Sequence, residues 1–152
     1  MDFTNLLGKV KGLEAFNGKD EVSNIVDENS DALVKSMQEQ LIEGKDISGF
    51  PRSDSYRPFT KAYKRMFGIG PGAIIDHVTF YMTGTLSESL YYSRSGDVFT
   101  IQSQLDTYGK MIDRIGFDEY GIDPQRRLFF ANTITLPNFK KVFTEKTTFI
   151  IE

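Results

Sequence analysis

The sequence contains no cysteine and one histidine, His77, and these two scarcities exclude several kinds of chemistry. Without cysteine there is no disulfide, no thiolate metal site and no cysteine nucleophile. A single histidine excludes the His-rich zinc patterns, and it leaves a Ser-His-Asp triad only if His77 is the base. We therefore expect a protein that needs no cofactor and works in a reducing compartment or in a particle assembled there.

Long apolar runs are also missing. No run approaches the roughly 20 residues that span a bilayer, and residues 1–11 lack the apolar centre of a signal peptide, so we expect no membrane segment. The net charge is −3 and the pI is about 5.3, which gives no overall attraction to DNA or to anionic lipid. Any contact with an acidic partner must come from a local basic segment.

What the chain does contain is enough apolar sequence for one packed domain. Its 152 residues are 39% hydrophobic and 26% charged, close to the average for a globular domain. No repeat and no linker divides it. We expect an N-terminal arm at 1–19, a single domain at 20–144 and a C-terminal tail at 145–152.

The arm mixes apolar residues with glycine and asparagine, which oppose a stable helix. Its apolar side chains stay in water unless something covers them. We predict that they form a subunit interface; they are Phe3, Leu6, Leu7, Leu13 and Phe16.

The segment from Asp20 to Glu43 has the periodicity of an amphipathic helix. Its apolar residues fall within an arc of roughly 160° at 100° per residue. They are Val22, Ile25, Val26, Leu33, Met37 and Leu41. One long helix is predicted, and Gly44 ends it.

The middle of the chain alternates as strands do. Val78–Met82 reads as one strand, and two further β-rich segments flank Ser95-Gly96-Asp97 as a hairpin, at Ser89–Arg94 and Val98–Ser103. The sheet is therefore predicted to be small and antiparallel.

Helical spacing returns in the last third of the chain. Leu105–Ile115 fits a helix, Asp123-Pro124 is a strong helix start, and Leu136-Pro137 restarts or kinks a further helix through Phe143. The predicted fold is α+β, a small antiparallel sheet packed against a long N-terminal amphipathic helix and C-terminal helices.

Motifs that suggest catalysis lack the context that catalysis needs. Gly68-x-Gly70-x-Gly72 leaves a helix and approaches a strand, the reverse of a nucleotide loop. Ser87 and Ser89 lie in no nucleophile elbow. We predict that the chain is not an enzyme, and a hydrolase centred on His77 is the enzymatic alternative.

Carboxylates cluster late in the sequence, at Asp113, Asp118, Glu119 and Asp123. Their spacing does not match a calcium loop, and acidic residues between two helices mostly serve as caps and solvated surface. We predict no metal site there.

The densest basic segment is a candidate contact surface. It consists of Arg52, Arg57, Lys61, Lys64 and Arg65, interleaved with Tyr56, Phe59, Tyr63 and Phe67. A short helix at Lys61–Phe67, capped by Thr60, would place the aromatic residues in the core and the basic residues in water. The alternatives are a nucleic-acid-binding module built on residues 52–67 and a basic surface that meets an acidic protein.

One stretch carries a family resemblance. Val78–Leu90 (VTFYMTGTLSESL) resembles the Thr-Gly-x-Leu-x-x-Ser-Ile/Leu signature of tailed-bacteriophage head–tail joining and tail-completion (neck) proteins. The helix ending at Gly44, the pattern Tyr56-x-x-x-Thr60-x-x-x-Lys64 and the closing Leu136-Pro137-x-Phe139 extend the similarity to about residues 20–142.

The resemblance implies a virion structural protein that forms a ring in a phage neck, connector or tail-completion assembly. Its implied partners are copies of itself and neighbouring portal, connector or tail proteins, with passive proximity to DNA. The implied location is the neck or tail of the virion, and the host cytoplasm during assembly. The resemblance carries over no catalytic residue.

Overall fold

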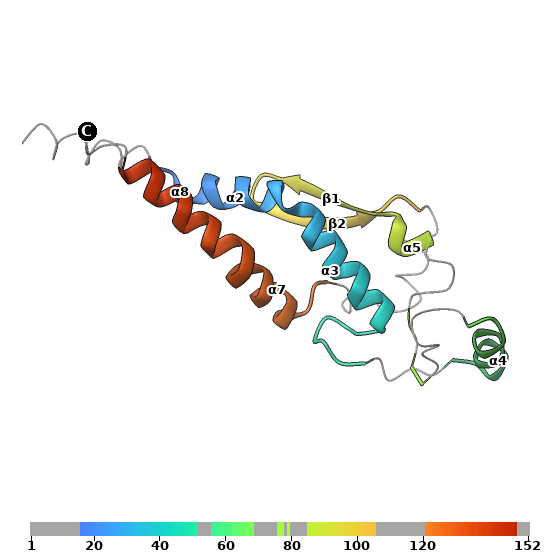
Figure 1. Ribbon diagram of the computed structural model, residues 1–152. Helices are drawn as coiled ribbons and strands as arrows, with labels where there is room; N and C mark the ends of the chain where they lie inside the picture. Colours follow the sequence, from blue (N-terminus) through green and yellow to red (C-terminus); the bar gives the residue numbers. More distant parts are fainter. Residues whose placement is uncertain are drawn as a thin grey trace, which may run out of the picture. The chain divides into compact units, whose positions relative to one another are not determined.

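The computed structural model describes residues 16–51, 56–68, 76–77, 79, 85–105 and 121–148 (Figure 1). In chain order its elements are α2 (Gly18–Glu28), α3 (Ser30–Glu43), α4 (Pro58–Phe67), α5 (Thr85–Glu88), β1 (Leu90–Ser95), β2 (Val98–Ser103), α7 (Pro124–Phe130), the π-helix η3 (Ala131–Thr135) and α8 (Leu136–Thr148). Helices with a small two-stranded sheet confirm the predicted α+β class. The chain forms two compact units, Met1–Ser30 with Leu128–Glu152, and Asp31–Arg127.

In the first unit, α2 packs against η3 and α8. Ile25, Val26 and Phe130 are buried there. The ring of Phe16 meets Phe139 and Phe143 edge-on, at centroid distances of 5.8 and 5.3 Å. Phe16, which was predicted to belong to a subunit interface, is therefore half-buried against its own chain.

The predicted single helix from Asp20 to Glu43 is two helices, because Asn29 interrupts it. Asn29 has φ −114° and ψ 20°, and its side-chain Nδ2 donates to the Ile25 carbonyl at 2.8 Å. An asparagine side chain that bonds to the backbone competes with the helical pattern. The predicted apolar stripe is divided accordingly, with Ile25 and Val26 buried in the first unit and Met37 and Leu41 in the second.

The second unit has its core where α3 meets α5 and the hairpin. Met37, Leu41, Leu86 and Leu90 form the buried cluster, and partly buried side chains surround it, namely Val34, Ile101, Leu105 and Ile122. Each of the four buried residues comes from a different turn or element, so α3, α5 and β1 are held to one another by this cluster.

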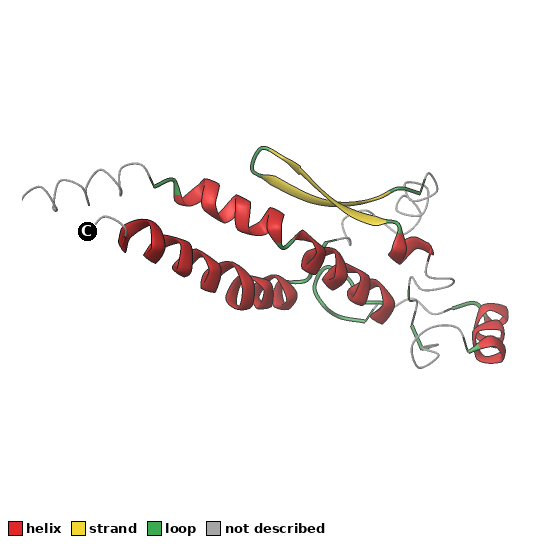
Figure 2. Ribbon diagram, turned by 45° about the horizontal axis from the view of Figure 1, so that its top comes forward, coloured by secondary structure: helices red, strands yellow, loops and turns green. Residues whose placement is uncertain are grey.

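The hairpin confirms the prediction to within one residue. β1 and β2 pair antiparallel with Leu90 opposite Ser103 and Ser95 opposite Val98 (Figure 2). Gly96, at a φ of 59°, occupies the turn between them. The left-handed conformation there is the reason that glycine suits this position.

The chain is helical from Pro124 to Thr148, with a π-helix in the middle. Pro137 lies in the first turn of α8, immediately after η3. Because proline has no N–H to donate, the wider π-turn accommodates the missing hydrogen bond without ending the helix. The helix continues into the predicted tail as far as Thr148, and residues 149–152 lie outside the described ranges.

Several predicted segments also lie outside the described residues. They are the arm to residue 15, the Thr83-Gly84 turn, most of the Val78–Met82 strand, and the Leu105–Ile115 helix after its first residue. The short basic helix is present but begins earlier than predicted, with Arg57 and not Thr60 at the N-cap.

Candidate functional site

Helix α4 is an amphipathic helix whose aromatic side lies in water. It begins with Pro58, which suits a first helical position, and ends at Gly68, whose φ is 58°. Its large apolar side chains are exposed by 81% at Phe59, 38% at Tyr63, 76% at Met66 and 59% at Phe67. We call these four side chains the aromatic face of α4.

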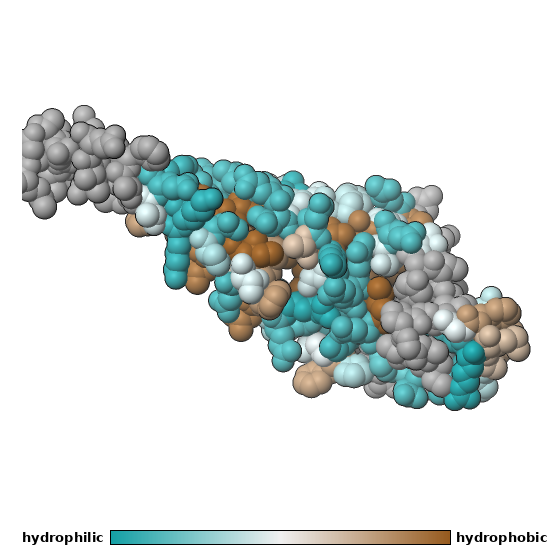
Figure 3. All heavy atoms as spheres, in the orientation of Figure 1, coloured by the Kyte–Doolittle hydropathy of each residue, from teal (hydrophilic) through white to brown (hydrophobic). Residues whose placement is uncertain are grey.

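The rings of this face form a ladder along the helix. Phe59 and Tyr63 have centroids 6.5 Å apart at an interplanar angle of 28°, and Tyr63 and Phe67 are 4.6 Å apart at 44°. A spacing of four residues places side chains on the same side of a helix, which is why the rings meet. In Figure 3, hydrophobic residues, coloured in brown shades, gather at the position of α4 beside teal, hydrophilic ones.

The opposite side of α4 is fixed to its own unit by Lys64, which is 1% exposed. Its Nζ donates to Tyr56 Oη at 2.7 Å and to Thr79 Oγ1 at 2.8 Å, and lies 4.4 Å from the centroid of the Tyr56 ring. The Tyr56 hydroxyl also donates to the Thr79 carbonyl and accepts from the Thr79 amide, both at 2.7 Å. We call this group the Lys64 anchor.

The structure therefore rearranges the predicted basic surface. Arg57 and Arg65 are exposed and Lys61 is half-buried, and all three are at or on α4. Lys64 is turned inward and does not belong to that surface, because its amine is bound by the anchor. Arg52 lies outside the described residues.

The expected arrangement of this helix, aromatic residues inward and basic residues outward, is wrong for the aromatic residues on α4 and for Lys64, whereas Arg57 and Arg65 are exposed as expected. Phe59 and Phe67 are among the exposed large apolar side chains, whereas Lys64 is among the most buried residues described. The physical reason is that Tyr56 and Thr79 supply hydrogen-bond acceptors that satisfy the amine, which offsets the cost of its burial.

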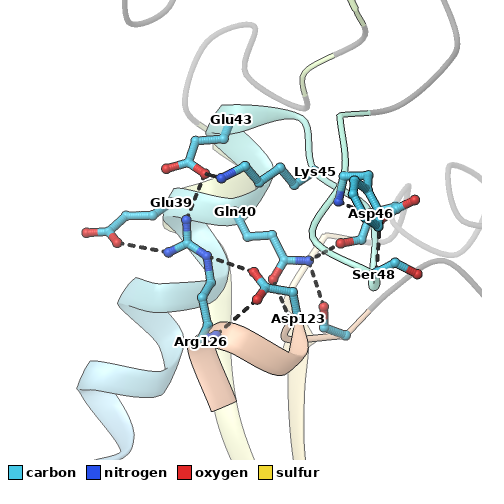
Figure 4. Close-up of polar contacts among 10 residues, drawn as sticks. Glu39, Gln40, Glu43, Lys45, Asp46, Ser48, Asp123 and Arg126 are labelled. Carbon is cyan, nitrogen blue, oxygen red and sulfur yellow. Dashed lines mark hydrogen bonds and ion pairs between the residues drawn. The ribbon is translucent and has the colours of Figure 1, made fainter. Parts of the chain in front are cut away.

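A second polar site lies where α3 ends and α7 begins (Figure 4). Arg126 reaches Glu39 at 3.1 Å, Glu43 at 2.8 Å and Asp123 at 3.1 Å. Asp123 is buried, and its Oδ1 accepts from the Arg126 backbone N–H at 3.0 Å, as the predicted helix start requires. Lys45 adds a further ion pair to Glu43 at 2.7 Å.

Gln40 lies at the centre of this network and is 1% exposed. Its Nε2 donates to the carbonyls of Asp46 and Gly121 at 2.9 and 2.8 Å, and its Oε1 accepts from the Asp123 N–H at 2.9 Å. One side chain thus satisfies backbone groups from two segments far apart in sequence. The network fastens the loop after α3 and the start of α7 to α3.

The charges of this network shift two pKa values. Partial burial alone would raise the pKa of Glu43, but hydrogen bonds from Lys45 and Arg126 outweigh it and hold that pKa below its ordinary 4.5. Burial opposes the charge of Arg126, and its bonds to Glu43 and Glu39 with the Asp123 charge keep its pKa above the ordinary value. Each group supports the ionised form of the other.

The predicted catalytic candidates have other contacts. His77 Nε2 lies 2.6 Å from the Glu43 carbonyl oxygen. The Ser89 hydroxyl donates to the Leu86 carbonyl at 2.7 Å and lies 2.6 Å from Ser103 Oγ. His77 and Ser89 therefore bind different partners, and each contact is a structural one.

Most of the remaining predicted site residues lie outside the described part of the chain. Among the described residues, no group of three or more His, Cys, Asp or Glu side chains is positioned to hold a metal ion. Asp113, Asp118, Glu119, and the arm residues Phe3, Leu6, Leu7 and Leu13 lie outside the described ranges. Within those ranges, no helix has the length and apolar character needed to cross a bilayer.

The sequence did not predict the contacts of the Lys64 anchor or of the Gln40–Arg126 network. Their members are far apart in the chain, since Gln40 and Asp123 are 83 residues apart. The sequence singled out Asp123 as a helix start and Tyr56 and Lys64 as members of the basic-aromatic segment, but it did not indicate that Lys64 is buried.

No protein-family model, curated protein or solved structure matches this chain.

Proposed function

We propose that this chain is a virion structural protein, a ring-forming subunit of a phage neck, connector or tail-completion assembly. The aromatic face of α4 carries the proposal. Phenylalanine, tyrosine, methionine and arginine are the residues enriched at protein interfaces, and here they lie together on one exposed helix. The resemblance of Val78–Leu90 to neck proteins supports this class of assembly.

The chain acts in this proposal by contact and not by catalysis. The Glu43 carbonyl oxygen can only accept, so His77 Nε2 carries a proton in this contact and is not itself available as a base. The hydrolase alternative predicts an esterase or peptidase activity that His77→Ala abolishes. Activity that survives this substitution would exclude His77 as its base.

Particle imaging and mass measurement on the purified full chain test the proposed function directly. We expect closed rings of a single stoichiometry, because a subunit with two different complementary patches closes into a ring when its rotation permits. A chain that stays monomeric at every concentration tested would contradict the proposal.

A nucleic-acid-binding module is the second candidate function, and the exposure of basic and aromatic side chains on the same helix favours it. Aromatic rings in water beside Arg57 and Arg65 are a feature of surfaces that bind single strands. With three cations at or on α4 outside the anchor, Arg57, Lys61 and Arg65, binding to single-stranded DNA would weaken with salt at a slope of about −2.1 in log K against log salt. Absence of binding at low salt would exclude this function.

A further inference from the structure

We infer that the outer edge of β2 pairs antiparallel with β2 of a second copy of this chain, so that the two hairpins join into one continuous sheet. The inference goes beyond the proposed function, because a two-fold contact of this kind joins copies in pairs and is separate from the head-to-tail contact that closes a ring. It follows from three features of the hairpin, namely its unpaired backbone groups, the lack of charge along β2, and the apolar side chains that the core leaves in water.

The outer edge of β2 carries backbone groups that the hairpin itself does not use. The strands are joined by a two-residue turn, so the pair that flanks the turn, Ser95 and Val98, exchanges hydrogen bonds across the hairpin. Hydrogen-bonded and non-bonded pairs alternate along an antiparallel ladder, and the N–H and C=O groups of Phe99 and Ile101 therefore point away from β1. Within the described ranges the sheet has these two strands, and neither Phe99 nor Ile101 makes a backbone hydrogen bond to any other segment.

β2 also lacks the features that keep an edge strand from pairing. Proteins protect exposed edges with charged side chains, proline or bulges. Val98–Ser103 contains no charged residue and no proline, and its register with β1 runs without a break from one end to the other. β1, in contrast, contains Arg94. One copy of β2 can therefore lie beside another without bringing like charges together.

The part of β2 nearest the turn keeps apolar area in water. Ile101 packs against the buried cluster of the second unit, whereas Phe99 and Val98 are exposed by 37% and 61%. The Phe99 ring stacks on Tyr92 with centroids 6.2 Å apart at an angle of 23°, on the same face of the hairpin as Ile101. A two-stranded hairpin is marginally stable in water where nothing covers it, and further strands stabilise it. A second hairpin at this edge would supply those strands.

One register uses both the backbone groups and the side chains. It places Phe99 of each copy opposite Ile101 of the other, so that their outward N–H and C=O groups exchange hydrogen bonds on both sides of a two-fold axis at Thr100. Phe99 then lies beside Ile101 of the second copy, and the two Thr100 side chains meet on the opposite face as a non-hydrogen-bonded pair. In the same register Val98 lies opposite Gln102 of the second copy.

A disulfide cross-link on the full chain tests this register, because the chain has no cysteine of its own. Opposite residues of a non-hydrogen-bonded antiparallel pair have Cα atoms about 4.5 Å apart, which a disulfide spans. We expect Thr100→Cys to form a covalent dimer under mild oxidation, seen on a non-reducing gel. Gln102→Cys is the matched control, since residue 102 is exposed on the same strand and face, yet its two copies lie about 14 Å apart in this register.

A charge exchange at the same position tests whether the occupant is a second copy. Thr100→Lys and Thr100→Glu should each dimerise about tenfold more weakly than the wild type, because like charges meet at the axis, and an equimolar mixture of the two should recover dimerisation. Analytical ultracentrifugation and mass photometry measure this, and circular dichroism verifies that each variant folds. Ser93→Lys is the matched control, since Ser93 lies opposite Thr100 within the hairpin and places the same charge on the other strand. The control should dimerise as the wild type does.

Three results would overturn the inference. Cross-linking of Thr100→Cys no faster than that of Gln102→Cys would show that β2 does not lie at a two-fold axis. Dimerisation that Thr100→Lys leaves unchanged would exclude the β2 edge, and rings in particle images would then leave the proposed function intact. A wild-type chain that is monomeric at every concentration would refute both. Dimers that cross-link through Thr100→Cys but never form rings would support this contact and contradict the proposed function.

Discussion

Gln40 is expected to contribute more to stability than any single salt bridge of the network around it. Its amide satisfies three backbone groups, the carbonyls of Asp46 and Gly121 and the N–H of Asp123. In Gln40→Leu the side chain keeps its approximate volume, so the principal loss is of hydrogen bonds and not of packing. The three backbone groups would remain without their partner.

The size of the effect follows from how deeply each group is buried. An unsatisfied buried polar group costs about 1–3 kcal/mol, and Asp46 and Gly121 are half-buried, so water reaches them in part. Burying leucine in place of an amide returns about 1–2 kcal/mol. We therefore expect Gln40→Leu to lower the free energy of unfolding by about 2–4 kcal/mol.

Gln38→Leu is the matched control on the same helix. Gln38 is half-buried and donates one hydrogen bond, to the Ser87 carbonyl at 2.8 Å, so its substitution should cost about 0.5–1.5 kcal/mol. Urea unfolding followed by circular dichroism measures both variants. Amide hydrogen exchange at Asp123 provides a local measurement and should accelerate only in Gln40→Leu. Equal costs for the two variants, with unchanged exchange at Asp123, would refute this account of the network.

Three further outcomes are expected. Met37→Ala should destabilise the chain by about 2–5 kcal/mol in the same urea assay, whereas Leu33→Ala, at a half-buried position, should cost less; equal costs would show that the core is misplaced. Because the folded-state pKa of Glu43 is lowered, its ionised carboxylate contributes to the free energy of unfolding above pH 4.5, and this contribution is lost as the pH falls through the folded-state pKa. The stability of Glu43→Gln should therefore fall less steeply with decreasing pH than that of the wild type. An equally steep fall in both proteins would contradict this sign. Phe16→Ala should lower the free energy of unfolding by about 1–3 kcal/mol, because it removes two edge-on ring contacts. Deletion of residues 2–15 should leave those contacts and the fold intact but weaken ring assembly. Normal assembly of the deletion variant would show that the arm is not part of the interface.

The parts of the fold that the sequence predicted are those that depend on neighbouring residues. The hairpin at 90–103 follows from alternation around a glycine turn, and the ends of α3 and α4 follow from Gly44 and Gly68, which both have positive φ. The start of α7 follows from Asp123 and proline. Each of these signals acts within a few residues.

The sequence-based predictions were wrong where a residue distant in the sequence supplies the decisive contact. Lys64 reads as a surface residue until Thr79, 15 residues later, supplies an acceptor for its amine. The Asn29 break could have been suspected from the residue type, but the apolar periodicity on both sides concealed it. Gln40 gave no signal, because its partners lie as far away as Asp123.

The inward position of Lys64 means that the side chains that hold α4 in place are not the ones on its exposed apolar face. An ordinary amphipathic helix packs against its domain through its apolar residues, so substituting them alters folding as well as any binding. In α4 the contact with the rest of the unit is polar, through Lys64, and the exposed face is apolar, so the two faces depend on different side chains. Under the proposed function, the residues that meet a partner, such as Phe59 and Met66, are separate from Tyr56, Lys64 and Thr79, which hold the helix in place.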